Sequence, residues 1–357
     1  MVFAEQYQTL LSYPESMWGE TPSSRWVSLC TGLRDYEAPG RSVAINVHKE
    51  RKWELVSAFQ KSIRRADILM ALRLISAMDN SPEEYAYFWK RLCVIACEDV
   101  GLADDTLVSF VVACSTVFPP KKTGSQNYDL FCFLVEQMCD LSNRSRIYCS
   151  YGAIKPEATK SELPELRSED EPIISAILQR HLAVRSANNR WLEWQKKNDW
   201  RAEALLRFVG LTLPLKITCV EAPEPHYVNL FGLPSYCYDM HTRVGLRMLR
   251  RLVRGVEEAE GIKELFQQNE VKSAHKVLGE ALFFVEGGHI QGELIYEPLC
   301  SLEQRLFAHQ CGLPLDAWWR LRVLTEKALE EGIIDRVREE VLLEFYGDTW
   351  WRRTSTP

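Results

Sequence analysis

The sequence predicts an all-α protein in which a helical bundle is followed by a second, mainly helical domain. Apolar residues recur at helical spacing in one segment after another, first between positions 55 and 141 and again between 239 and 345. The breaks between these segments are short clusters of Asp, Asn, Ser, Pro and Gly, and no run of alternating strands accompanies them. Helices joined by short loops are typical of bundles.

Three helices open the bundle. The first carries an apolar face made by Leu55, Val56, Phe59 and Ile63. The second starts near Ala66 and is apolar almost all round as far as Met78, which predicts burial. The third has Ser81 as its cap and Pro82 in its first turn, and it ends before Gly101, which suits the left-handed C-terminal position.

The remaining elements follow the same logic. Asp104 or Asp105 can cap a fourth helix at Thr106–Phe118, and further helices are expected at Asp129–Leu141 and Asn143–Ala153. Residues 211–236 hold several prolines and at most one or two short strands. The second-half helices are predicted at Asp239–Glu260, Glu270–Val285, Ser301–Gln310, Asp316–Glu331 and Asp335–Phe345.

These elements divide the chain into five parts. The N-terminal arm has one short helix around Phe3–Leu11 and a strand-like SVAINV run. The acidic, proline-containing segment is either a linker or a surface loop. The expected parts are the arm at 1–50, the helical bundle at 51–154, the acidic segment at 155–171, the second domain at 172–346 and the tail at 347–357.

Part of the bundle resembles a known family. The strings AFQKSIRRAD, RLCVIACEDVGLAD and LSNRSRIYCSYGAI resemble the helical C-terminal region of the RarA/MgsA replication-associated recombination ATPases, over about residues 54–154. In that clamp-loader-like family the region is an oligomerisation and collar domain after the ATPase. The resemblance implies an assembly role near replication forks, with Glu98, Asp99 and Gly101 as a structural motif. The chain has no GxxxxGK[ST] phosphate loop, so no catalysis is expected from this region.

Composition narrows the class of protein. A hydrophobic fraction of 46%, a charged fraction of 26% and a net charge of −6 are those of an ordinary globular protein with only local basic patches. Eleven scattered cysteines predict buried, reduced thiols and a cytoplasmic protein. The N-terminus lacks a signal peptide pattern and no apolar run is long enough for a membrane span. No cofactor and no metal are expected.

A row of arginines is the most pointed charged feature. Arg243, Arg247, Arg250 and Arg254 share one face of a predicted helix, with Arg251 beside them. Like charges this close need an acidic partner, which is nucleic-acid phosphate, an acidic protein surface or the acidic run Glu257, Glu258 and Glu260. The alternative is a solvated face with intramolecular salt bridges.

Two further basic groups and one Asp–His pair are candidates. Lys61, Arg64 and Arg65 would face DNA, or pair with Glu98 and Asp99, or contact a neighbouring subunit. Trp350, Trp351, Arg352 and Arg353 suit stacking on bases or docking on a partner, or a tail that folds back on its own domain. Asp239 and His241 are spaced as metal ligands or an acid–base pair, but no third ligand is near, and Asp239 or Thr242 is equally explained as a helix cap.

These observations predict a non-enzymatic accessory protein of DNA replication or recombination. It would act by assembly with a polymerase or clamp-loader-like ATPase, with DNA and a second copy of the chain as further candidate partners and no membrane. A collar-like domain without the ATPase domain would fit a replication system of a phage or mobile element. The alternatives are an inhibitor or decoy that co-assembles with a host recombination ATPase, and an enzyme acting on nucleic acid through Asp239 and His241.

Overall fold

The computed structural model describes residues 3–18, 21–40, 51–78, 82–100, 104–118, 128–141, 168, 227–256, 259–286 and 297–347. In these ranges nearly every element is a helix, and the strands form one two-stranded antiparallel hairpin. The predicted all-α fold is confirmed.

The first half of the chain follows the predicted order with two corrections. The first helix continues through Pro14 beyond the expected end at Leu11, and a second helix lies at Ser24–Arg34, where none was predicted. Asp104 is the cap of the fourth predicted helix, since its side chain accepts a hydrogen bond from the Leu107 amide at 2.9 Å. The elements are α1 (Phe3–Trp18), α2 (Ser24–Arg34), α3 (Lys52–Arg64), α4 (Ile68–Met78), α5 (Pro82–Ile95), the π-helical turn η2 (Ala96–Val100), α6 (Asp105–Val117) and α7 (Tyr128–Leu141).

The described residues of the second half also match, except that the helix predicted over residues 239–260 is a turn followed by a helix that ends at Gly255, and that the helix at Glu260–Gln268 was not predicted. The Thr242 hydroxyl accepts a hydrogen bond from the Gly245 amide at 3.1 Å, so α11 begins only at Arg243. The elements are β1 (Asn229–Leu230), β2 (Leu233–Pro234), the 3₁₀ turn η5 (Ser235–Cys237), α11 (Arg243–Gly255), α12 (Glu260–Gln268), α13 (Ala274–Glu286), α14 (Glu297–Cys311), α15 (Leu315–Glu330) and α16 (Ile333–Tyr346).

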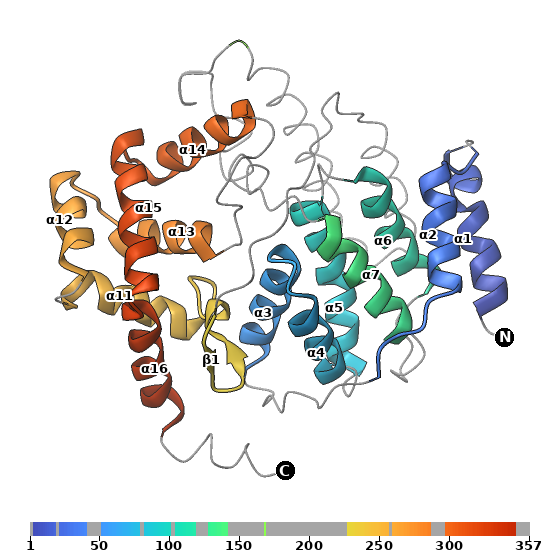
Figure 1. The fold of residues 1–357 in the computed structure, drawn as a ribbon, viewed down its shortest axis with the longest axis horizontal. Coiled ribbons are helices and arrows are strands. Elements are labelled where there is room, and N and C mark those ends of the chain that lie inside the picture. The colour runs from blue at the N-terminus through green and yellow to red at the C-terminus, as the bar shows by residue number, and fades with distance from the viewer. Residues whose placement is uncertain are drawn as a thin grey trace.

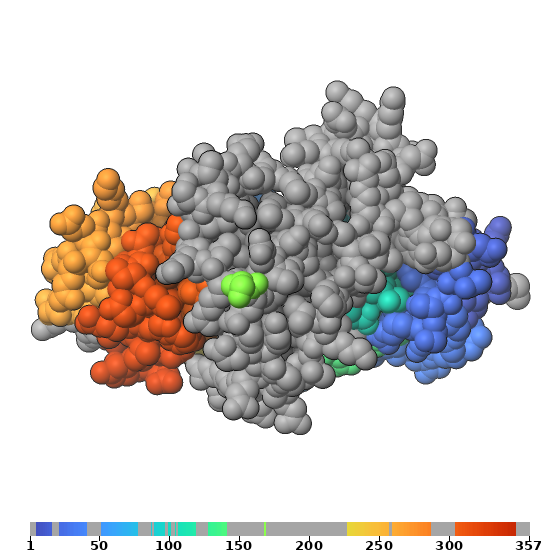
Figure 2. Space-filling view, turned by 90° about the horizontal axis from the view of Figure 1, so that it is seen from above, coloured from blue at the N-terminus to red at the C-terminus, as the bar shows by residue number. Residues whose placement is uncertain are grey.

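The two halves lie side by side along the longest axis of the molecule. Helices α1 and α2 stand at one end and α12 at the other, with α15 next to α12 (Figure 1), and Figure 2 shows the same two ends from above. In the middle, α3 packs against η5 and β2, and this is the main contact between the described elements of the two halves. The buried hydrophobic residues on both sides form one continuous cluster.

Several predicted features lie outside the described residues. These are the SVAINV run, the position of Gly101, the helix at Asn143–Ala153, the acidic segment apart from the exposed Ser168, and residues 172–226.

Candidate functional site

The arginine row predicted from the sequence lies along one exposed side of α11. Arg243, Arg247, Arg250 and Arg254 are all exposed, whereas Val244, Met248, Leu249 and Leu252 on the opposite side are buried in the core. The helical spacing of the arginines therefore places them on a single stripe facing away from the core, as predicted. We call Arg243, Arg247, Arg250, Arg251 and Arg254 the arginine stripe.

One edge of the arginine stripe is paired with α16. Arg247 Nη2 lies 2.9 Å from a Glu344 oxygen, and Arg251 Nη2 lies 2.5 Å from the other. Arg251 also reaches Glu340 at 3.4 Å. The acidic partners in the described structure thus come from α16 and not from Glu260 of the run that the sequence suggested. All four side chains are at least 36% exposed, so each pair is worth about 1 kcal/mol or less.

The other edge of the stripe has no acidic neighbour within the described part of the chain. No ion pair or hydrogen bond joins the side chain of Arg243, Arg250 or Arg254 to a described residue. Partial burial, and after it the positive charges of Arg250, Lys276 and Arg254, lower the pKa of His275. The stripe and the start of α13 therefore make one local basic surface on a protein of net charge −6.

The basic cluster of α3 is a correction to the sequence analysis. Lys61 and Arg64 are each 1% exposed, so they cannot face DNA. Lys61 Nζ lies 3.0 Å from Asp239 Oδ2, and Arg64 Nε donates to Asp99. Arg65 donates to the backbone carbonyl of Glu286 and is half-buried. The sequence analysis also offered pairing of these cations with Glu98 and Asp99, and the structure shows this pairing between Arg64 and Asp99.

Asp239 orders the turn that precedes α11. Its Oδ1 accepts from the His241 amide at 2.9 Å, and its Oδ2 lies 3.1 Å from His241 Nδ1. Burial alone would raise the pKa of Asp239, but Lys61 and His241 together hold it well below its usual range. Burial also lowers the pKa of Lys61, against the attraction of Asp239. Because the carboxylate can only accept, Nδ1 of His241 is the donor and Nε2 is left as the second ring nitrogen.

Gly245 makes this turn possible. A Cβ atom at position 245 would lie 1.8 Å from the carbonyl oxygen of Asp239. The turn can fold back over the first turn of α11 only because this position has no side chain.

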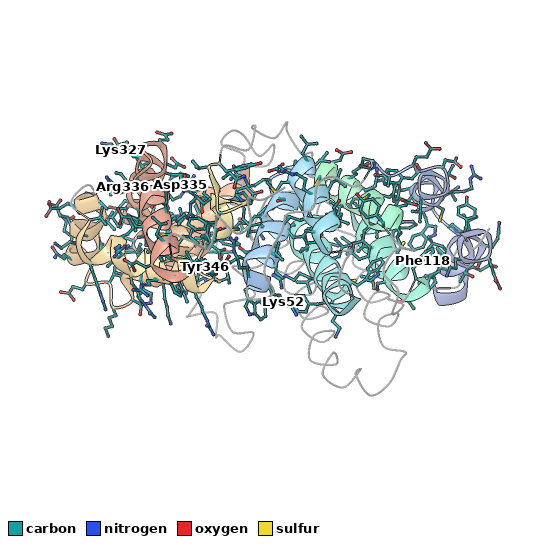
Figure 3. The ribbon with its side chains drawn as sticks, turned by 90° about the horizontal axis from the view of Figure 1, so that it is seen from below. Lys52, Phe118, Lys327, Asp335, Arg336 and Tyr346 are labelled. Carbon is teal, nitrogen blue, oxygen red and sulfur yellow. The ribbon has the colours of Figure 1, made fainter. Side chains whose placement is uncertain are left out.

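The junction between the halves contains more buried charge than the sequence indicated. Arg51 pairs with Glu54 at 2.5 Å and donates to the Phe231 carbonyl at 2.7 Å, and Tyr346 donates to Glu54 at 2.8 Å. Figure 3 labels Tyr346 at the end of α16 and Lys52 at the start of α3, where the two halves meet. The first half is therefore tied to the second by hydrogen bonds across the hairpin and α16.

Arg338 of α16 is the most enclosed of these cations, with 0% of its side chain exposed. Its two terminal nitrogens each lie 2.6 Å from a Glu286 oxygen, and Nη1 also lies 2.8 Å from Asp335. This fork could not be predicted from local sequence patterns, because Glu286 is 52 positions earlier in the chain.

Asp99 is the member of the motif formed by Glu98, Asp99 and Gly101 whose side chain the structure describes. Asp99 is 1% exposed and belongs to the π-helical turn η2, which follows α5 directly. The side chain of Glu98, together with Gly101, lies outside the described residues. Among the described cysteines, Cys30, Cys114, Cys132, Cys139 and Cys237 are buried, and Cys93 and Cys311 are half-buried.

Other candidate features of the sequence give limited information. Trp350, Trp351, Arg352 and Arg353 lie outside the described residues. Within the described ranges, no three His, Cys, Asp or Glu side chains are placed to hold a metal ion, and no helix has the length and apolar character to cross a membrane. Comparison with protein-family models, with curated proteins and with solved structures found no match to this chain.

Proposed function

We propose that this protein is a non-enzymatic accessory factor of DNA replication or recombination and that the arginine stripe binds the DNA phosphate backbone. The observation that carries the proposal is the exposure of Arg243, Arg250 and Arg254 without an acidic neighbour among the described residues. Three unpaired guanidinium groups on one side of a helix repel one another, and phosphate relieves that repulsion.

The dimensions of the stripe fit a duplex backbone. Arg243 and Arg254 are eleven residues apart, which is about 16 Å along an α-helix. At about 3.4 Å per phosphate along each strand, that length covers about five phosphates. Arg247 lies over the Phe345 ring, and its ion pair with Glu344 is exposed, so a phosphate can replace that pair at little cost.

The surroundings of the stripe add to its positive potential. His275 lies close enough to Arg250, Lys276 and Arg254 for their positive charges to lower the pKa of its imidazole. Since the whole chain is acidic, attraction to DNA would be confined to this surface and binding would be independent of base sequence. Such a contact suits a factor that acts wherever a fork or a joint is being processed.

The test is a titration of fluorescently labelled duplex and single-stranded DNA, read by anisotropy at several NaCl concentrations. The test variant changes Arg243, Arg250 and Arg254 to Gln. If all three contact duplex phosphates, the slope of log affinity against log salt becomes shallower by about 2.7, from about 0.9 for each contact.

The matched control removes the same charge from elsewhere on the second half. Arg320, Lys327 and Arg336 are exposed residues of α15 and α16, and Figure 3 labels the last two. Their joint change to Gln should leave the salt slope within error of the unmodified protein. Equal affinity and slope for the stripe variant and the unmodified protein would refute the DNA contact.

A further inference from the structure

A second feature, separate from the arginine stripe, is a pocket of about 460 Å³ at the junction of the two halves. It lies between α3, α5, the turn at residues 239–241 and α13. Its volume falls in the range of about 300–1,000 Å³ that is typical of small-molecule sites, and such sites are common where domains meet.

Aromatic rings form two walls of this pocket. Trp53 is 62% exposed and meets Tyr87 edge to face, with ring centroids 6.1 Å apart. Phe283 stands by His241 with centroids 5.2 Å apart. An indole this exposed leaves a large apolar face uncovered at a pocket, and a flat ring is the group that covers such a face best.

The charges that line the pocket leave one cation uncompensated. Lys61 is balanced by Asp239, and Arg64 is balanced by Asp99. Arg91 donates to the neutral Gln60, and in the described part of the chain no carboxylate lies within salt-bridge distance of it.

Arg91 also has unused hydrogen-bonding capacity. Its Nε is buried and makes no hydrogen bond to any residue that the structure describes. A guanidinium group with a buried donor and no counter-charge is suited to the two oxygens of a carboxylate or phosphate. His241 lines the same pocket, with its Nδ1 committed to Asp239 and Nε2 available to a ligand.

We propose that this pocket binds a small organic anion that joins a planar ring to one phosphate or carboxylate group. The oxyanion is held by Arg91, with His241 as a second polar contact, and the ring lies against Trp53 and Tyr87. The shared chemistry is an oxyanion on a flat ring, and the two possible sources, phosphate and carboxylate, are separated by the choice of probe.

The experiment is isothermal titration calorimetry of the full chain with adenosine 5′-monophosphate, benzoate, adenosine and inorganic phosphate. We expect one of the two ring-bearing anions to bind with a Kd of about 1 mM or tighter. Adenosine and inorganic phosphate, which each lack one half of the ligand, should bind at least about tenfold more weakly than adenosine 5′-monophosphate if phosphate is the anion recognised. If carboxylate is the anion recognised, benzoate should bind and the other three probes should not.

Two variants locate the site. Arg91→Gln should weaken the ring-bearing anion about tenfold and leave adenosine unaffected, because only the ion pair is lost. Trp53→Ala removes an exposed side chain, so folding is retained, and it should weaken every ring-bearing probe. Thermal unfolding of each variant checks that the fold is intact.

The arginine stripe variant separates this proposal from the proposed function. If the probe bound to Arg243, Arg250 and Arg254, their change to Gln would abolish its binding, whereas binding in the pocket is unchanged. Failure of both ring-bearing anions to bind, or unchanged binding by both Arg91→Gln and Trp53→Ala, overturns the pocket proposal. Neither result bears on the DNA titration.

Discussion

Two Arg–Glu pairs that join α16 to other helices should differ several-fold in their effect on stability, because one pair is buried and the other is exposed. Arg338 and Glu286 are 0% and 3% exposed, with both nitrogen–oxygen distances at 2.6 Å. Arg251 and Glu344 are 39% and 36% exposed and 2.5 Å apart. The chemistry is the same, and α16 contributes one partner to each pair.

The expected magnitude follows from what each substitution leaves behind. Arg338→Met leaves the Glu286 carboxylate buried without its fork, which should cost about 3–5 kcal/mol of unfolding free energy. Replacing both partners, as Arg338→Met with Glu286→Leu, removes the buried charge as well as the pair and should cost much less than the sum of the single changes. For the exposed pair, Arg251→Gln should cost about 1 kcal/mol or less.

The assay is urea unfolding followed by circular dichroism, with thermal unfolding as a second measure. At about 1.3 °C for each kcal/mol in a chain of 357 residues, Arg338→Met should lower the Tm by at least about 4 °C, and Arg251→Gln by about 1 °C at most. If Arg338→Met and Arg251→Gln are equally mild, or if the double variant loses the sum of its singles, the burial argument is wrong.

Two further predictions concern α11 and the basic surface. Gly245→Ala should lower stability by more than about 2 kcal/mol and shift the NMR signals of the preceding turn, since its Cβ would lie 1.8 Å from the Asp239 oxygen. Gly255→Ala on the same helix meets nothing within 4 Å and should be neutral or stabilising, so equal losses would contradict the steric explanation. The pKa of His275 in the folded protein is below its ordinary 6.5. The free energy of unfolding should therefore decrease as the pH falls below 6.5, because the unfolded chain binds this proton more readily than the folded protein does. DNA affinity has the opposite sign: it should rise as pH falls, because protonated His275 adds a charge beside Arg250. His275→Ala should remove that rise in an anisotropy titration between pH 8 and 5. An identical pH profile for the variant would exclude His275 from the interface.

The helices were predictable from the sequence because they depend on spacing within short segments. Helix α2 was missed although its signal is present, with Ser23 accepting from the Trp26 amide at 3.2 Å as an N-cap. Buried residues then follow at helical spacing, namely Trp26, Leu29, Cys30 and Leu33. The neighbouring Gly, Pro and Ser residues are typical of a loop, so no helix was predicted there. Within the helix, Gly32 packs close to Phe133, because a Cβ at position 32 would lie 3.1 Å from the Phe133 ring.

In the candidate site too, features that depend on local spacing could be predicted, and features that depend on contacts between distant segments could not. The arginine stripe could be predicted because all its members lie on one helix, and its face is set by periodicity alone. The burial of Lys61 could not, because its hydrogen-bond acceptor at Tyr236 is 175 positions away and no local pattern reports such a contact. The pocket was missed for the same reason, since Trp53, Arg91 and His241 come from separate segments.

The buried polar face of α3 limits where an assembly partner could bind. In a collar that oligomerises, a basic cluster such as Lys61, Arg64 and Arg65 would be available to a neighbouring subunit. In this chain Lys61 is satisfied by Asp239 and Arg65 by the Glu286 carbonyl, both from the second half. A fragment limited to residues 51–154 would lose these partners and leave a cation on an apolar face, at a cost of several kcal/mol. Partner and DNA experiments therefore need the full chain, and an interaction seen only with the fragment would report a surface that the whole protein keeps covered.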